Sequence, residues 1–448
     1  MKLIYNVHDK PKFGQLIIFA VQQLLAIMAA TLVVPIIIGN DMSPSAALFG
    51  AGVGTLVYLM FTKFRSPVFL GSSFAFLGSM AAAFAGGVSM SLGYLGLIMG
   101  AIFGGLVYVI IALAVKFAGV NWLNKLMPPV VIGPTVAIIG LSLAGNAVGD
   151  LQAPEAGLGG NVFVCILIGL VTLGVTMLAA TFGKKMARLI PFILGILAGY
   201  AVAAICTIIG DAAGIEALKV IDFSYFTALV EGGVSLNTFV SVPDFTFLTA
   251  IDGFKELNGA YIGTIAVAYV PVAFVVFAEH VADHKNISSI IERDLLEDPG
   301  LHRTLLGDGI GSMAGAIFGG CPNTTYGESV GCVAITGNAS VVTIITAAVG
   351  AILISFITPF VAFVDSIPPC VMGGVCMALY GFIAVSGLKM IQKVDLEQNK
   401  NLFVVSVILI AGIGGLALNF GSVTITSIAT ALILGILTNL LLKKAEEQ

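Results

Sequence analysis

The sequence predicts an all-α polytopic membrane protein with fourteen transmembrane segments in a seven-plus-seven inverted repeat. Hydrophobic residues make up 58% of the 448 positions, charged residues only 10%, and the mean hydropathy is +1.07. Soluble proteins carry about 25% charged residues. Apolar runs that exceed the roughly 20 residues needed to cross a bilayer as a helix recur to the end of the chain. A double-proline motif occurs twice, and two polar stretches interrupt the apolar pattern.

The apolar runs predict the segments in order along the chain. No cleavable signal peptide is expected, because the first run is too long for a signal sequence and no small-residue cleavage site follows it. The first seven segments are predicted at residues 14–38, 44–62, 77–86, 93–118, 128–147, 161–182 and 189–210. The second seven are predicted at residues 258–284, 305–319, 327–337, 340–364, 369–388, 400–420 and 423–442.

Lysine and arginine residues collect on alternate loops of this arrangement. If the N-terminus is cytoplasmic, all of them except Lys219 and Lys255 fall on inside loops. These two lie in the long acidic segment 211–257, and long loops are translocated largely regardless of charge. If the predicted number of helices were wrong by one, many of the Lys and Arg residues would fall on outside loops. We therefore predict a multi-pass membrane protein with both termini in the cytoplasm.

A repeated motif relates the two halves. "LMPPVVIGPTVAIIG" at 126–140 resembles "SIPPCVMGGVCMALYG" at 366–381, with double prolines that begin at Pro128 and Pro368. The two copies open the fifth and twelfth helices, which are seven spans apart and therefore run in opposite directions. This spacing is typical of transporters built from inverted repeats. The alternative is that double prolines merely start helices, as they do in unrelated proteins.

Two polar stretches lie in the short third and tenth segments. "SPVFLGSSFAFLGSM" at 66–80 and "GGCPNTTYGESVG" at 319–331 are too rich in Ser, Thr, Gly and Pro to begin as helices. Extended backbone at membrane depth is tolerated only where it is buried in protein or lines a cavity. We predict that the stretches form a small antiparallel pair. Each then leads into a half-helix whose free N–H groups lie near the midplane.

The predicted spans contain few ionisable residues. We count three acids, Glu279, Asp283 and Glu328, and no Lys or Arg. Such groups are costly in a membrane and indicate function, although pairing with polar helices is an alternative. Glu279 and Asp283 are four residues apart and share one helix face. Because two neighbouring buried charges repel each other, we expect this pair to share one proton near neutral pH.

Histidine and cysteine give no sign of a cofactor. His280 and His284 form a second stripe on the eighth helix; we expect His280 to hydrogen-bond across helices and His284 to be solvated at the cytoplasmic edge beside Lys285. The six cysteines lie mostly in apolar surroundings without metal-type spacing. We predict no metal, no other cofactor and no nucleic-acid partner.

The acidic membrane interior restricts the substrate. An anion usually needs a cationic residue or strong hydrogen-bond donors, whereas carboxylates accept ring N–H groups and helix-end amides donate to ring carbonyls. A neutral, planar nucleobase therefore fits best. A channel or facilitator and an anion exchanger of the same architecture remain alternatives. An enzyme is not expected, because no nucleophile–base pair or H-E-x-x-H motif is present.

Four stretches carry a family resemblance. "GSSFAF", "AEHVAD", "DPGLHR" and "PNTTYGESVG" resemble the uracil permeases of the nucleobase-ascorbate transporter family, also called nucleobase:cation symporter-2. The resemblance covers nearly the whole chain. It implies a core domain of segments 1–4 and 8–11 and a gate domain of segments 5–7 and 12–14. The implied boundaries are 1–126 and 258–365 for the core, 127–210 and 366–448 for the gate, and 211–257 for an outer loop.

The resemblance also implies roles for individual residues. Glu279 matches an eighth-helix glutamate that binds the base, and Glu328 matches the tenth-segment acid on its other side. Phe74 matches a position whose backbone amide meets the base. Tyr326 and Gly327 supply the matching backbone before Glu328.

One further site residue and three departures follow from the same comparison. Tyr380 matches a gate-domain tyrosine that faces the site. Asp283 stands where characterised uracil permeases carry histidine, a choice more usual in purine members. Ser329 replaces a common asparagine, and Gln23 stands where many bacterial relatives have histidine. Glu328 favours uracil, since purine transporters mostly have glutamine there.

The resemblance therefore implies a proton-coupled uracil importer of the bacterial inner or plasma membrane. Glu279, Asp283 and Glu328 are expected to take part in proton coupling. Xanthine or urate is the alternative substrate, and Na⁺ is the alternative coupling ion. The expected partners are the nucleobase, a proton and membrane lipid, and the chain is a candidate for a homodimer. The composition of segment 211–257 is compatible with either a structured cap or a solvated connection.

Overall fold

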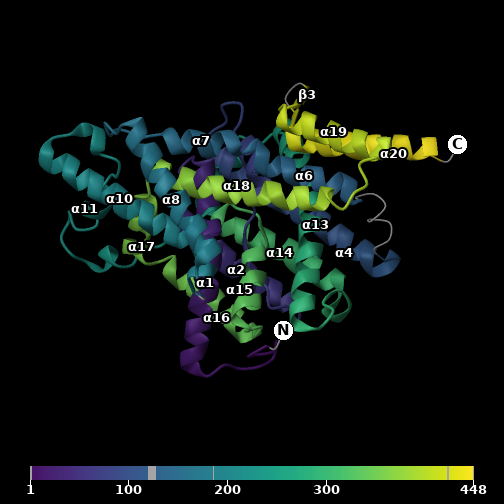
Figure 1. Ribbon diagram of the computed structural model, residues 1–448, viewed down its shortest axis with the longest axis horizontal. Helices are drawn as coiled ribbons and strands as arrows, with labels where there is room; N and C mark the ends of the chain where they lie inside the picture. The colour runs from purple at the N-terminus through teal and green to yellow at the C-terminus, as the bar shows by residue number, and fades with distance from the viewer. Residues whose placement is uncertain (1–2, 120–127, 185, 421–422, 447–448) are drawn as a thin grey trace.

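A computed structural model describes residues 3–119, 128–184, 186–420 and 423–446. Three of the inside-loop cations, Lys2, Lys125 and Lys185, lie outside the described residues, as does the expected domain boundary at 126–127. Most of the described chain is helical (Figure 1). Eight of the described helical stretches are long and apolar enough to cross a membrane.

Each of the first seven predicted segments has a counterpart. The third segment begins as a strand, and the fifth is divided into two helices. The elements are α1 (Phe13–Ile38), α2 (Pro44–Phe61), β1 (Leu70–Ser72) with η1 (Phe74–Phe76) and α3 (Leu77–Ala83), α4 (Met90–Ala118), α6 (Pro129–Ser142) with α7 (Ala144–Gln152), α8 (Val162–Phe182), α9 (Met186–Leu189) and α10 (Pro191–Ala213).

The second seven segments are also present. They are α13 (Gly259–Ile291), α14 (Leu301–Gly319) preceded by η4 (Leu296–Gly300), β2 (Asn323–Thr325) with α15 (Gly327–Thr336), α16 (Val341–Ile354) with α17 (Thr358–Asp365), α18 (Pro369–Ile391), α19 (Asn399–Ile413) and α20 (Ser427–Glu446). The fourteen-segment prediction is therefore confirmed, with three local differences.

The differences lie in the last four segments and at the end of α13. The predicted helix 340–364 is divided between α16 and α17. A hairpin of β3 (Leu418–Phe420) and β4 (Val423–Ile425) occupies residues that we predicted as the ends of two helices. The glycine-rich run before β3, with Gly415 at a φ of 71°, and the β-branched residues of β4 favour a hairpin over continued helix. Helix α13 continues to Ile291, well beyond the predicted residue 284.

Local side-chain caps set several of the helix starts. The side chain of Ser43 accepts a hydrogen bond from the third residue of α2, and that of Ser89 does the same for α4. Asn161 and Asn258 cap α8 and α13 in a similar way. Each cap satisfies a backbone N–H that has no partner within its helix, which fixes where the helix enters the membrane.

The two polar stretches form the predicted antiparallel pair. Leu70 of β1 is opposite Thr325 of β2, and Ser72 is opposite Asn323. Both strands are fully buried. Hydrogen bonds from Ser73 N–H to the Pro322 carbonyl (2.9 Å) and from the Tyr326 N–H to the Phe69 carbonyl (3.2 Å) extend the pairing at each end. Strand pairing thus satisfies backbone groups that no water reaches at this depth.

The two double-proline helices pack directly on each other. Pro128 and Pro368 are the extended N-cap residues of α6 and α18, and the proline that follows each occupies the first helical turn, where a missing N–H costs nothing. A Cβ atom at Gly140 would lie 2.3 Å from the Tyr380 carbonyl oxygen, and one at Gly387 would lie 2.3 Å from a backbone nitrogen of α6. Glycine is therefore required for this backbone contact.

Two groups of helices are separated in space. Figure 1 shows α6, α18, α19 and α20 along the upper edge, and α1, α2, α15 and α16 in the lower half. The strand pair belongs to the lower group, since β1 and β2 contact α1, α2 and α14. The site described below lies between the two groups.

Segment 211–257 is a structured cap rather than a solvated connection. It contains η2 (Glu216–Leu218), α11 (Ser224–Thr227), η3 (Leu236–Thr238) and α12 (Thr246–Gly253). An isolated β-bridge joins Val240 to Ile357, and the Ser241 N–H donates to the Phe356 carbonyl at 3.0 Å. Figure 1 shows α11 at the opposite end of the long axis from the C-terminus.

Candidate functional site

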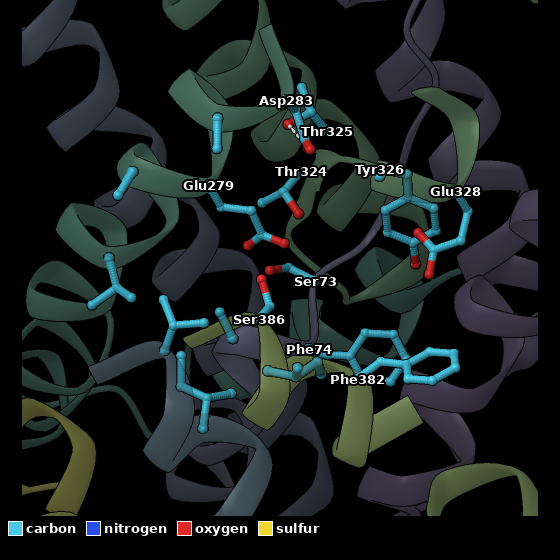
Figure 2. A pocket seen from close by; sticks show the side chains of 18 of the residues that line it. Ser73, Phe74, Glu279, Asp283, Thr324, Thr325, Tyr326, Glu328, Phe382 and Ser386 are labelled. Atoms are coloured by element: carbon cyan, nitrogen blue, oxygen red, sulfur yellow. Dashed lines mark hydrogen bonds between the residues drawn. The ribbon is translucent and has the colours of Figure 1, made fainter. Parts of the chain in front are cut away.

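A cavity of about 490 Å³ lies between the strand pair and the double-proline helices (Figure 2). This volume is within the usual range of small-molecule sites, roughly 300–1,000 Å³. One wall comes from α13, the strand pair and α15, and the other from α6, α10 and α18. The described lining contains no Lys, Arg or His. Its polar members are Ser73, Glu279, Asp283, Asn286, Thr324, Thr325, Tyr326, Glu328 and Ser386.

Glu279 enters the cavity from α13. Figure 2 shows its carboxylate pointing into the space between Thr324 of β2 and Ser73, which follows β1. Its neighbours along the lining, Ala278 and Ala282, are small and apolar. The carboxylate is therefore exposed to the cavity, and the next polar side chain of α13 in the lining is Asp283, one turn away.

Glu328 enters from a different element, the first turn of α15. The helix begins at Gly327 after the extended residue Tyr326, so its first N–H groups lack partners within the helix. A carboxylate in a first turn is also favoured by the positive end of the helix dipole. Figure 2 places Glu328 beside Tyr326 and away from Glu279 across the cavity.

Tyr326 holds the strand pair with its side chain. Its hydroxyl donates to the Ser72 carbonyl at 2.7 Å. The ring lies so close to β1 that a Cβ atom at Gly71 would be 2.4 Å from it. Thus the ring has a structural role, while Tyr326 and Gly327 both contribute to the cavity wall.

Asp283 lies one turn after Glu279 and also lines the cavity. The Thr325 hydroxyl donates to the Asp283 Oδ2 at 3.0 Å. Figure 2 shows the carboxylate turned towards Thr325 rather than towards the cavity centre. Asp283 therefore ties α13 to β2, and the two acids of α13 occupy one side of the cavity as their spacing predicted.

Phe74 and Tyr380 lie on opposite sides of the cavity wall. Phe74 lines the cavity, and its ring meets the Tyr380 ring edge-on with centroids 6.5 Å apart. Tyr380 itself is buried and is not part of the lining, whereas its neighbours Leu379 and Phe382 are among the α18 residues that reach the cavity. Tyr380 thus contacts a cavity-lining side chain, Phe74, but does not itself line the cavity.

The count of ionisable residues in the spans was wrong. Lys116 and Lys400 lie inside the predicted spans 93–118 and 400–420, and the acids number four rather than three. Asp308 is a fourth, buried in α14, and it lies within the predicted span 305–319. Its Oδ2 is 2.6 Å from the Nδ1 of His280, whose Nε2 is 3.0 Å from the Thr304 hydroxyl. The expected cross-helix bond of His280 is therefore confirmed. A check of every acid against the predicted spans would have found Asp308.

His284 is not solvated, so that expectation was also wrong. It is completely buried, and its Nε2 is 2.7 Å from the Tyr58 hydroxyl. The reason is the length of α13, which continues for two turns beyond the predicted end. Its ring stacks on that of His280 with centroids 4.0 Å apart, on the side of the helix away from the cavity.

Two residues that depart from the family pattern contact each other. The Gln23 side-chain amide donates to the Ser329 hydroxyl oxygen, which also accepts from the Phe69 N–H at 3.0 Å. Ser329 adjoins Glu328 and is completely buried. One hydroxyl therefore joins α1, the residue before β1 and the half-helix α15. Sequence alone gave no sign of this contact, because the partners are 306 residues apart.

Metal-binding groups are not gathered at this site. Among the described residues, no set of three or more His, Cys, Asp or Glu side chains is placed to hold a metal ion. The cysteines form no disulfide; five are buried and Cys206 is half-buried. The cavity offers carboxylates, hydroxyls and helix-end amides to a ligand.

Comparisons with known proteins show the family of this chain. The model of the family described as "Permease family" matches residues 14–420. The chain is 39% identical to the uracil permease of Bacillus caldolyticus over 98% of this chain and 95% of that protein. It is 37% identical to the uracil permease of Bacillus subtilis over 100% of this chain and 97% of that protein.

A solved structure shares the fold. The transmembrane domain of the cyanobacterial bicarbonate transporter BicA matches 97% of this chain and 100% of that domain, with a TM-score of 0.61 and 14% identity. This likeness concerns the fold alone and agrees with the seven-plus-seven arrangement. With the family model and the uracil permeases matched over nearly their whole length, the chain belongs to the Permease family, the nucleobase-ascorbate transporters that its motifs resemble.

Proposed function

We propose that this protein imports uracil by proton symport, with alternating access between a core and a gate domain. The observation that carries the proposal is one cavity that contains Glu279 and Glu328 on different elements and no Lys, Arg or His in its described lining. The uracil permeases among its relatives support the same substrate.

The cavity chemistry is suited to a pyrimidine ring. Uracil has two ring N–H groups and two carbonyls. Glu279 and Glu328 accept from the N–H groups on opposite sides, and the free backbone amides at Phe74 and Gly327 donate to the carbonyls. The Phe74 ring lies against the base. Each polar edge of the base thereby keeps a partner, which buried recognition requires.

Proton coupling is assigned to the acids. A buried carboxylate without a cation is costly, and a proton taken up by Glu279 removes that cost. Asp283 is one turn away and accepts a hydrogen bond from Thr325 of β2. A proton shared by this pair, with Glu328 as the third acid, links protonation to the position of β2.

Alternating access is supported by a second cavity. It has a volume of about 240 Å³ and is lined by the ends of α1 and α6 and the start of α20. Phe74 and Ile139 line both cavities, so these two side chains form a thin barrier between them. The main cavity reaches Asn286 and Met390 near the C-terminal ends of α13 and α18, the cytoplasmic ends by the charge pattern.

The two sides of the barrier correspond to different domains. Phe74 belongs to residues 1–126, which with 258–365 form the core. Ile139 belongs to residues 127–210, which with 366–448 form the gate. Rigid displacement of the core against the gate opens one cavity and closes the other. With the termini in the cytoplasm, the conformation described here is inward-facing.

Uptake by purified protein in vesicles tests the proposal. Labelled uracil should accumulate when the outside is more acidic than the lumen, and a protonophore should abolish the accumulation. Replacing Na⁺ by choline at a fixed pH gradient should change nothing. A strict Na⁺ requirement, or equilibration without accumulation, contradicts proton symport.

Purine transport is the second candidate because of Asp283, whose counterpart is more usual in purine members. Competition by xanthine and urate for uracil uptake separates the two substrates. Sulfate and bicarbonate serve as the anion panel, and thermal stabilisation by either anion but not by uracil contradicts the nucleobase proposal.

A further inference from the structure

Helix α12 carries an exposed apolar face. Ala250 and Gly253 are buried against the rest of the protein, whereas Leu248, Ile251 and Phe254 are 56%, 58% and 63% exposed. Because each residue turns a helix by about 100°, positions three apart share one face. The three side chains form a continuous stripe that points away from the protein; we call it the α12 stripe.

The position of α12 along the membrane normal follows from its contacts with the outer end of α4. A Cβ atom at Gly253 would lie 2.4 Å from the Ser91 carbonyl oxygen. At the other end of α12, the Thr246 hydroxyl and the Leu97 side chain lie 2.9 and 3.1 Å from the position of a Cβ atom at Gly320. Helix α12 therefore extends from the level of Leu97 to the level of Ser91.

This level coincides with a membrane boundary. Helix α4 has 29 residues and is about 43 Å long, more than the roughly 30 Å of the hydrocarbon core. If Lys116 marks one boundary, the other lies about 20 residues back, close to Leu97. Ser91 is then about 9 Å further out, among the headgroups. Helix α12 crosses from the edge of the hydrocarbon into the headgroup region.

The surface next to α12 already faces lipid. On α4, Ile102, Leu106, Ile110 and Phe117 are exposed on one side of the helix, as expected for a lipid-facing side. Leu95 lies on the same side towards the outer end, and it is buried. Where α12 packs on α4, protein takes the place that lipid occupies further along the helix. The α12 stripe continues the lipid-facing surface at that level.

We propose that the α12 stripe inserts into the acyl–headgroup boundary of the leaflet opposite the chain termini. The occupant of this face is lipid, and the site is an interfacial anchor of the kind formed by amphipathic helices. Lys255, exposed at the end of the stripe and 2.7 Å from Asp252, has its ammonium group at headgroup level.

The anchor adjoins the turn that leads into β2. Thr246 contacts the turn at Gly320, which has a φ of 70° and leads through Cys321 into β2. Lipid that holds α12 therefore also braces the turn before the strand that carries Thr324 and Thr325. This inference goes beyond the proposed function and does not depend on which solute is carried.

Fluorescence quenching by brominated lipid tests the anchor directly. The sequence contains a single tryptophan, Trp122, so a Trp122→Phe background makes an introduced tryptophan the only one. Ile251→Trp in this background is reconstituted into phosphatidylcholine vesicles with and without bromine on the acyl chains. Its emission should lose most of its intensity in the brominated vesicles and should be blue-shifted in the unbrominated ones.

The matched control places tryptophan at Glu231, an exposed position of the same outer segment, where we expect no quenching. Phe254→Trp repeats the measurement at a second stripe position in case Ile251→Trp does not fold. Tryptophans at 251 and 254 that are quenched no more than the one at 231 overturn the proposal. The stripe is then either in water or covered by protein such as a second copy of the chain.

Discussion

Glu279→Gln is the substitution that tests the transport mechanism most directly. Glutamine keeps the size of the side chain and one acceptor oxygen, but it has neither the charge nor the exchangeable proton. Hydrogen bonds to charged groups contribute about 1.5–3 kcal/mol. Uracil affinity should therefore fall by about 10- to 150-fold, since 1.4 kcal/mol corresponds to tenfold. The surrounding alanines and Thr324 offer no second carboxylate at this position.

Proton coupling gives the same variant a second, sharper readout. In the unmodified protein, the KM for uracil should rise as the outside pH rises, because the symported proton becomes scarcer. In Glu279→Gln, this pH dependence should be absent and accumulation against a gradient should be lost. The assays are uracil binding by calorimetry and uptake into vesicles across a range of outside pH on both sides of neutrality.

The exposed Glu256→Gln provides the matched control, since it is the same change on the outer segment. It should leave both binding and pH dependence unaltered. If Glu279→Gln is correctly folded and still shows strong pH-dependent accumulation, the assignment of Glu279 as the proton site is refuted.

Three further predictions concern the residues around the base. Asp283→Asn keeps an acceptor for Thr325, so calorimetry should show that uracil affinity changes by less than about tenfold. Vesicle assays of the same variant should show that gradient-driven accumulation is lost. A loss of affinity with accumulation retained contradicts a role in proton coupling. Gln23→Met and Ser329→Ala should each raise the KM by about tenfold, and the double variant should cost no more than the worse single one because both remove one shared hydrogen bond. Gln22→Met is the control for that cycle and should have no effect, whereas additive effects of Gln23→Met and Ser329→Ala refute the coupling. Ile139→Trp should thicken the barrier between the two cavities, so uracil uptake should stop while thermal stabilisation of the detergent-solubilised protein by uracil remains. Normal uptake by this variant would contradict the barrier.

The segments were predictable because membrane insertion depends on local properties. An apolar run of sufficient length has few alternatives to a helix in a bilayer. The polar stretches at 66–80 and 319–331 were recognisable as strands by the same reasoning, since the residues in them disfavour helix and the membrane requires pairing. Their pairing with each other followed from the inverted repeat. The hairpin of β3 and β4 was missed because a glycine-rich run at a helix end has no equally strong constraint.

The acids of the site were found by their rarity in apolar surroundings. Glu279, Asp283 and Glu328 all line the cavity, as their positions in the sequence suggested. Asp308 was overlooked although the same criterion applies to it, and His284 was misplaced because the end of α13 was set too early. The first error was an oversight within the predicted span 305–319, and the second followed from a helix end that was set seven residues too early.

The sequence by itself determined the class of protein, the number of segments, the inverted repeat and the acids available for binding. These follow from composition, length and local pattern, which act within one segment at a time. Only the tertiary structure decided which groups meet. It placed Tyr380 behind Phe74, joined Gln23 to Ser329 and packed α12 on α4. Contacts between distant segments depend on how helices pack, and no local pattern carries that information.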